Sequence, residues 1–161
     1  DIVLDAFSEL PDYHLTICGP VNREDDFEKV CYKELYQSKN IKTLGFIDVR
    51  SDHFLDVIKN TSALIYPSCS EGQAGSVITC LHAGLIPLVS YESGVDVDDF
   101  GIILQKSSVD EVVESIKILS QKPNEKLRRM SKSAWLYART HHTREKFAEC
   151  YNAFVNNILS K

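Results

Sequence analysis

Short apolar runs alternate with longer amphipathic segments from the start of the chain to Leu104. The short runs have the length of strands, and they predict strands at 15–19, 41–47, 63–66, 87–90 and 101–104. Apolar residues at helical spacing between these runs predict helices. The first helix is already under way at residue 1, and the others are expected at 24–37, after a cap at Ser51, and at 76–83.

Two of these helices have apolar residues whose spacing defines a face. The helix at 24–37 carries Phe27, Val30, Cys31, Tyr32 and Leu35 at helical spacing. The helix capped by Ser51 is expected to bury Phe54, Leu55 and Ile58.

The pattern changes after Leu104. Three helices are predicted in a row, at 109–120, 124–139 and 143–159, with no strand between them. The earlier alternation of strands and helices is typical of right-handed crossover units in a parallel sheet. The strands are apolar on both faces, as strands covered by helices should be. The sequence therefore predicts an α/β fold, a doubly wound parallel sheet with a helical C-terminal tail.

Length and charge narrow the classes of function. The 161 residues fit one domain, over 1–161, that is long enough to bury a core. The net charge of -5 argues against nucleic acid or an anionic membrane surface as a partner, because either would need a basic face. No apolar stretch is long enough to cross a bilayer.

Cysteine usage indicates the compartment. The number of cysteines is odd, and no two of them form a CxxC pair. Reduced thiols in a cytoplasmic protein are therefore the expected state, and disulfides are the alternative. The five are Cys18, Cys31, Cys69, Cys80 and Cys150.

The loops that follow the strands are the candidate chemistry. Ligands of a doubly wound sheet bind beyond the carboxyl ends of its strands, which places the loops at 19–20, 45–47, 67–75 and 90–94 on one rim. The loop at 67–75 is the most informative, because it joins a strand directly to a helix. Its two glycines let the backbone approach a ligand closely, and the free amides of the next helix favour an anion.

This loop fits a phosphate, but its motif is neither a Walker loop nor a GxGxxG fingerprint. Glu71 lies at the mouth of the loop, where a carboxylate is suited to accept hydrogen bonds from sugar hydroxyls. On the loop alone, a plain tight connection between strand and helix is the alternative.

The stretch from Ser68 to Ser90 resembles the donor-binding segment of GT-B glycosyltransferases of the family-4 type. Both have Ser, two variable residues, Glu-Gly, a glycine-containing loop, a short helix that ends in Ala-x-Gly, and x-Pro before an apolar strand. The segments at 4–7, 15–19, 44–47 and 101–104 resemble the same family in order and spacing. The resemblance implies a Rossmann-like domain that is one half of a GT-B fold.

The resemblance also implies a function and a site. Family members bind a nucleotide-diphospho-sugar in this domain and transfer the sugar, here expected to be a hexose, to an acceptor held mostly by the other domain. The resemblance makes Glu71 the candidate catalytic residue, the one that contacts the donor sugar. It implies neither a cofactor nor a metal. The candidate donor-binding residues are Gly19, Gly45, Phe46, Ile47, Gly72, Gln73, Ala74, Gly75, Ser76 and Thr79.

Each part of the donor has its own candidates. The amides of 72–76 would meet the diphosphate, 45–47 would hold the base, and Gly19 would lie at the nucleotide side of the cleft. Thr79 occupies the position of a second family glutamate that binds the ribose, and a threonine hydroxyl can still form that hydrogen bond. A local role for Thr79 within its helix is the alternative.

Two family features are missing from the sequence. The basic pair that neutralises the leaving diphosphate lies upstream of the first helix in the family, and the acceptor domain is absent. We therefore expect a fragment that lacks the N-terminal acceptor domain and the first strand. Expected partners are the donor and, through the missing domain, an acceptor sugar, lipid or polysaccharide, with peripheral membrane contact open for the full protein.

The expected activity is a retaining hexosyl transfer in polysaccharide or glycoconjugate synthesis, and the fragment alone is expected to be inactive. Two alternatives stay open. The first is a non-catalytic module that binds a nucleotide sugar, which Thr79 motivates. The second is a sugar-nucleotide epimerase with the same fold and the same class of donor.

Overall fold

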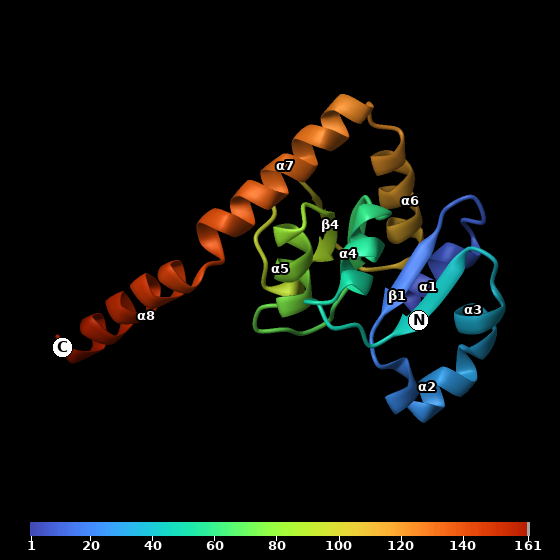
Figure 1. The fold of residues 1–161 in the computed structure, drawn as a ribbon, viewed down its shortest axis with the longest axis horizontal. Coiled ribbons are helices and arrows are strands. Elements are labelled where there is room, and N and C mark those ends of the chain that lie inside the picture. The colour runs from blue at the N-terminus through green and yellow to red at the C-terminus, as the bar shows by residue number, and fades with distance from the viewer. Residues whose placement is uncertain (161) are drawn as a thin grey trace.

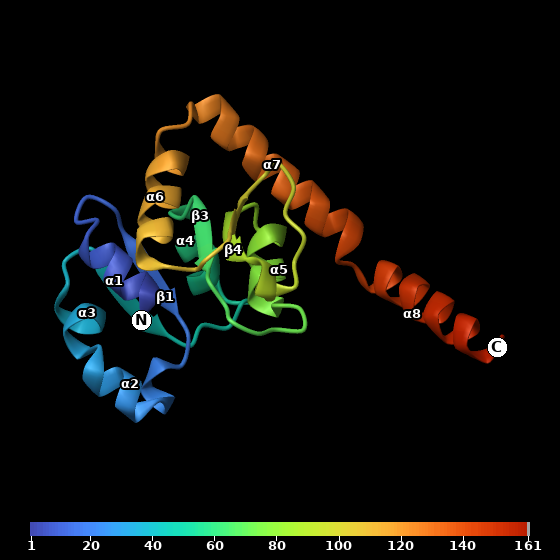
Figure 2. The same cartoon turned by 180° about the vertical axis from the view of Figure 1, so that it is seen from behind.

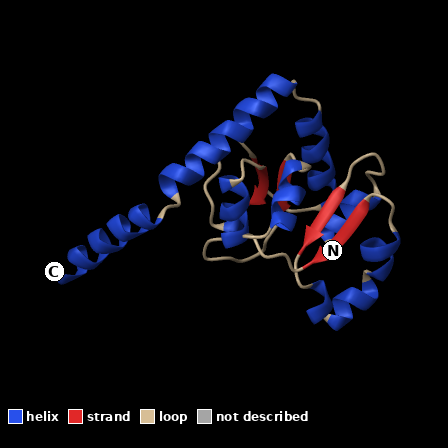
Figure 3. Cartoon of the chain, viewed as in Figure 1, coloured by secondary structure: helices blue, strands red, loops and turns tan. Residues whose placement is uncertain are grey.

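The computed structural model describes residues 1–160. They form eight α-helices, two 3-10 turns and five strands (Figures 1 and 3). In chain order these elements are α1 (Ile2–Ser8), β1 (Leu15–Cys18), η1 (Val21–Arg23), α2 (Asp25–Val30), α3 (Tyr32–Gln37), β2 (Ile41–Gly45), α4 (Asp52–Lys59), β3 (Ala63–Tyr66), α5 (Gly75–His82), β4 (Ile86–Ser90), η2 (Tyr91–Ser93), β5 (Ile102–Leu104), α6 (Val109–Ser120), α7 (Asn124–His141) and α8 (Arg144–Leu159).

All strand pairs are parallel, which confirms the predicted fold class. The strands form two sheets: β1 pairs with β2, and β3, β4 and β5 pair in that order. β4 is central in its sheet, and every residue of it is buried. A strand covered on both faces has this pattern. No ladder joins the two sheets within residues 1–160, so the five strands do not make one continuous sheet.

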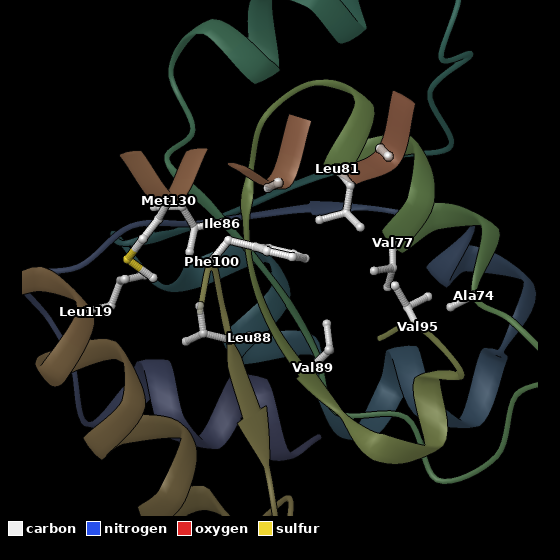
Figure 4. Close-up of a cluster of buried hydrophobic side chains, with 12 residues drawn as sticks. Ala74, Val77, Leu81, Ile86, Leu88, Val89, Val95, Phe100, Leu119 and Met130 are labelled. Atoms are coloured by element: carbon white, nitrogen blue, oxygen red, sulfur yellow. The ribbon is translucent and has the colours of Figure 1, made fainter. Parts of the chain in front are cut away.

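The largest core cluster surrounds β4. In this cluster β4 packs against α5 and against α7. The residues of α7 that take part are Met130, Ala134 and Ala138. Figure 4 shows Ile86, Leu88 and Phe100 directed into this cluster. Because these residues are almost fully removed from water, the cluster fixes the carboxyl end of β4 and the loops around it.

Helix α1 ties the two sheets together. Ala6 and Leu10 pack against α6, and Leu4 and Phe7 pack toward α3 and β2. Asn40, just before β2, donates hydrogen bonds from Nδ2 to three backbone oxygens at the end of α1 and in the following turn, with N···O distances of 2.8, 3.1 and 3.2 Å. These bonds connect the start of β2 with the end of α1 and the turn that follows it.

The predicted cap of α4 is confirmed, since the Ser51 hydroxyl accepts a hydrogen bond from the Phe54 amide. The buried face predicted for this helix is partly wrong. Leu55 is 51% exposed, and Phe54 and Ile58 are only half-buried. The periodicity was that of an amphipathic helix, but no layer covers α4 fully.

The single helix predicted at 24–37 is also wrong, because the chain leaves helical geometry at Cys31 and forms α2 and α3. Only Leu35 is buried there, and Val30 and Tyr32 are 82% and 53% exposed. The second strand stops at Gly45 and not at Ile47, since Gly45 adopts a φ of +70°, which ends an extended segment.

The predicted C-terminal helices are confirmed within two residues at their ends. α7 lies along the β4 sheet, and α8 leaves the body of the molecule (Figures 1 and 2). No residue of α8 is buried. Across the part of the chain that the structure covers, no helix combines the length and apolar character that a membrane span requires.

Candidate functional site

The loop between β3 and α5 is built around an open helix start. Pro67 follows the last residue of β3, and α5 begins at Gly75 with Ala74 as its N-cap. No side chain caps this end, so the first amides of α5 are available to a ligand. A Cβ placed on Gly72 or Gly75 would meet no atom within 4 Å, which leaves space at both positions.

The loop over 67–74, between β3 and α5, is called the donor loop below. The end of β4 and the loop that follows it hold the donor loop in place. Ser90 Oγ donates a hydrogen bond to Ser68 O at 2.6 Å, and the Ala74 amide donates to Ser93 O at 2.9 Å. Gly94 has a φ of +66°, and a Cβ on it would lie 2.2 Å from Gly72 O. The two backbones can approach this closely only because Gly94 has no side chain.

The same two loops also share apolar contacts. Ala74 and Val95 belong to the main core cluster, and Figure 4 shows them close together beside Val77. Sequence reasoning gave the loop at 90–94 no role in shaping the donor loop. The one local signal was a glycine shortly after a buried strand, which is too common to indicate a specific contact.

Glu71 is exposed and has one partner among residues 1–160. The Tyr66 hydroxyl, at the end of β3, donates a hydrogen bond to Glu71 Oε1 at 2.6 Å. This bond raises the pKa of Tyr66, and partial burial adds to the increase. The second carboxylate oxygen has no protein donor in the described structure, so it can accept from a ligand.

A hollow of about 910 Å³ opens beside Glu71. It contains four carboxylates and the rings of two tyrosines and a histidine, and no lysine or arginine is among its described lining residues. Such a surface accepts hydrogen bonds from hydroxyls and repels phosphate. The lining residues are Cys69, Ser70, Glu71, Tyr91, Glu92, Gly94, Val95, Asp96, Val97, Asp98, Ile103, Tyr137 and His141.

A smaller hollow of about 460 Å³ lies at the ends of β1 and β2. The Gly19 amide donates to Gly45 O at 2.9 Å, which brings these two predicted residues together. Phe46 lines the hollow and is 75% exposed, while Ile47 does not line it. An exposed aromatic ring beside a backbone turn can stack on a flat base.

Thr79 lies on α5, away from both sets of lining residues. Its hydroxyl donates a hydrogen bond to Gly75 O at 2.9 Å, one turn earlier in the same helix. The hydrogen is therefore used by the helix backbone, and only the oxygen lone pairs are free for a ligand.

Within residues 1–160, no three His, Cys, Asp or Glu side chains are grouped so that they could hold a metal ion. All five cysteines are free thiols, and three of them, Cys18, Cys69 and Cys150, are exposed.

The parallel α/β fold carries a glycine-rich loop at an uncapped helix start, an arrangement that suits an anionic ligand. Residues 1–136 match the family model described as glycosyl transferases group 1, and the chain belongs to this family. No curated protein sequence matches the chain.

Two solved structures share the fold. A glycosyltransferase from Rickettsia africae superimposes with a TM-score of 0.78 at 12% identity, over 98% of this chain and 44% of that one. HepE of Anabaena, in complex with UDP-glucose, superimposes with a TM-score of 0.74 at 15% identity, over 94% of this chain and 44% of that one. The chain thus spans less than half the length of either protein.

Proposed function

We propose that this chain is the donor-binding half of a hexosyltransferase that takes its sugar from a nucleotide-diphospho-sugar. The observation that carries the proposal is that Glu71 lines a hollow rich in hydrogen-bond acceptors and belongs to the loop that leads into an uncapped helix start. The helix start favours phosphate and the hollow favours hydroxyls, which are the two chemical parts of such a donor on either side of the scissile bond.

Each part of the donor then has a partner. The amides of Gly72, Gln73, Gly75 and Ser76 bind the diphosphate and stabilise the negative charge that develops as it leaves, while the Ala74 amide holds the loop through Ser93 O. Glu71 orients the sugar by accepting from its hydroxyls. The base lies against Phe46 and Gly45 in the smaller hollow, with Gly19 hydrogen-bonded to Gly45 O and Ile47 next to Phe46 in the chain, and the ribose lies near Thr79. Backbone amides and the helix dipole stabilise the charge of the diphosphate in this proposal, which therefore includes no metal and no cofactor.

The rest of the reaction belongs to the whole protein. The acceptor, a sugar, lipid or polysaccharide, binds to the part that lies outside this sequence. Transfer is with retention and serves polysaccharide or glycoconjugate synthesis in the cytoplasm, with peripheral membrane contact through the full protein. The UDP-glucose bound by HepE, a protein of the same fold, supports the class of donor.

A second candidate is a module that binds a nucleotide sugar without turnover. It is favoured by one observation, that the Thr79 hydroxyl is engaged by Gly75 O. A ribose hydroxyl would then find a weaker acceptor than a carboxylate.

Calorimetric titration of the full-length protein with UDP-, GDP- and ADP-hexoses, together with assays of donor hydrolysis and transfer, tests both candidates. Glu71→Ala should weaken hexose-nucleotide binding roughly tenfold or more, because hydrogen bonds to a charged group are lost. Glu114→Ala, which removes an exposed glutamate on α6, is the control and should change nothing. Tight binding without turnover would select the module, and no binding of any nucleotide would refute both.

A further inference from the structure

The Tyr66–Glu71 pair joins a rigid strand to an exposed loop. Tyr66 is the last residue of β3, paired in register with Val89 of the fully buried strand β4. Its ring is half-buried, and its hydroxyl reaches Glu71 Oε1 at 2.6 Å. A side chain fixed by a strand therefore holds a side chain whose own backbone lies in a loop.

Glu71 has little else to hold it. Its side chain is exposed, and Tyr66 supplies the one side-chain hydrogen bond it receives within the described residues. A free glutamate samples several rotamers, and binding a ligand through it costs the entropy of selecting one. A phenol that donates to an ionised carboxylate makes a short, charge-assisted bond and selects that rotamer before the ligand arrives.

The same bond divides the two carboxylate oxygens. Oε1 is engaged by the phenol, and Oε2 is left to accept from hydroxyls in the hollow beside it. Because Tyr66 approaches from the strand, it lies behind Glu71 and does not line that hollow. Tyr66 thus acts on a ligand through Glu71.

We propose that Tyr66 is the positioning residue of Glu71. Through Glu71 it contributes to the preference for a nucleotide-diphospho-sugar over the nucleoside diphosphate without a sugar. The inference rests on the proposed function. The phenol helps a donor that has hydroxyls opposite Oε2. Its remaining interaction is with the Ser76 side chain at the start of α5, so the Glu71 bond is what distinguishes a sugar nucleotide from a nucleotide without a sugar. Tyr66 is accordingly a determinant of donor affinity that the family resemblance did not indicate.

The first test compares UDP-glucose with UDP in calorimetric titrations of the full-length protein. Tyr66→Phe should weaken UDP-glucose roughly tenfold, the factor that the rotamer entropy of one glutamate supplies, and leave UDP unchanged. The control is Tyr13→Phe, which removes a tyrosine hydroxyl that bonds Ser120 Oγ at 2.8 Å, remote from the site. An equal change for both ligands, or no change, would overturn the inference.

The second test needs no ligand. The pKa of Tyr66 is raised by its bond to Glu71, so Glu71→Gln should lower it toward the ordinary value of 10.0. NMR of ring-labelled tyrosine, with Tyr66 assigned by Tyr66→Phe, reports this shift directly. An unchanged titration would show that the pair does not exist, whatever the protein binds. If the pair titrates as expected but neither nucleotide binds, the proposed function is overturned, and the sugar-selecting role with it.

Discussion

Gly94→Ala should displace the donor loop although it adds only one carbon atom. The new Cβ would lie 2.2 Å from Gly72 O, 3.0 Å from Gly72 C and 3.2 Å from Gln73 Cα. All three are backbone atoms, so no rotamer change relieves the overlap. The residue would also have to keep a φ of +66°, which a side chain disfavours.

The cost follows from these contacts. Holding alanine in the left-handed region costs about 1–2 kcal/mol. Moving the loops apart breaks the bond from the Ala74 amide to Ser93 O, with a net loss of about 1 kcal/mol. The free energy of unfolding should therefore fall by about 2–3 kcal/mol, and the affinity for a sugar nucleotide should fall with the displaced loop.

Denaturant titration of the full-length protein measures the stability change, and hydrogen exchange of the amides over 68–76 localises it. Gly75→Ala is the matched control for stability, because its Cβ meets no atom within 4 Å at the start of α5. Gly75→Ala should raise the free energy of unfolding by about 0.4–1 kcal/mol, because alanine lowers the conformational entropy of the unfolded chain. A Gly94→Ala protein as stable as the parent, with unchanged exchange over 68–76, would refute the reasoning that the two loops are in contact.

Three further outcomes follow from individual side chains. Thr79→Glu should strengthen nucleotide binding roughly tenfold in calorimetry, because a carboxylate replaces a hydroxyl that already donates to Gly75 O. Unchanged binding would show that the ribose does not lie near residue 79. Burial raises the pKa of Cys80 to about 11, so a thiol reagent at pH 8 should label exposed Cys69 and leave Cys80 unmodified in peptide mapping. Desolvation raises the pKa of Glu111, but three backbone amides at 105–107 donate to its carboxylate and, with the charge of Lys106, outweigh it, so the pKa lies below the ordinary value of 4.5. Because the folded pKa is depressed, this stability is present above pH 4.5 and lost as the pH falls through the folded pKa. The carboxylate largely faces water, so Glu111→Gln should cost less than about 1 kcal/mol at pH 7 and nothing well below that window. An equal cost at both pH values would contradict the assignment.

Local features could be predicted from the sequence because they depend on neighbours in the chain. The strand at 63–66 and the helix at 109–120 have the predicted bounds, and the Ser51 cap is in place. The glycine-rich connection into α5 was also recognised, since a strand, a turn and a helix follow one another within a few residues. The periodicity of apolar residues and the positions of turn-forming residues are enough to predict such elements.

Features that depend on distant segments could not be predicted in this way. The exposure of Leu55 depends on whether another layer covers α4, and helical periodicity carries no information on that. Ser93 and Gly94 contact Ala74 and Gly72 of the donor loop. These segments are about twenty residues apart in the chain and meet because they follow adjacent strands. The bond from Tyr66 to Glu71 spans only five residues, but it depends on the path of the loop between them.

The central claim is that one donor molecule bridges the start of α5 and the Glu71 hollow. The most direct test is a crystal structure of the full-length protein with the sugar nucleotide that binds most tightly in the titrations. We expect the diphosphate on the amides of Gly72, Gln73, Gly75 and Ser76, the sugar hydroxyls on Glu71 Oε2, and the base against Phe46. A nucleotide bound elsewhere, or a sugar turned away from Glu71, would contradict it.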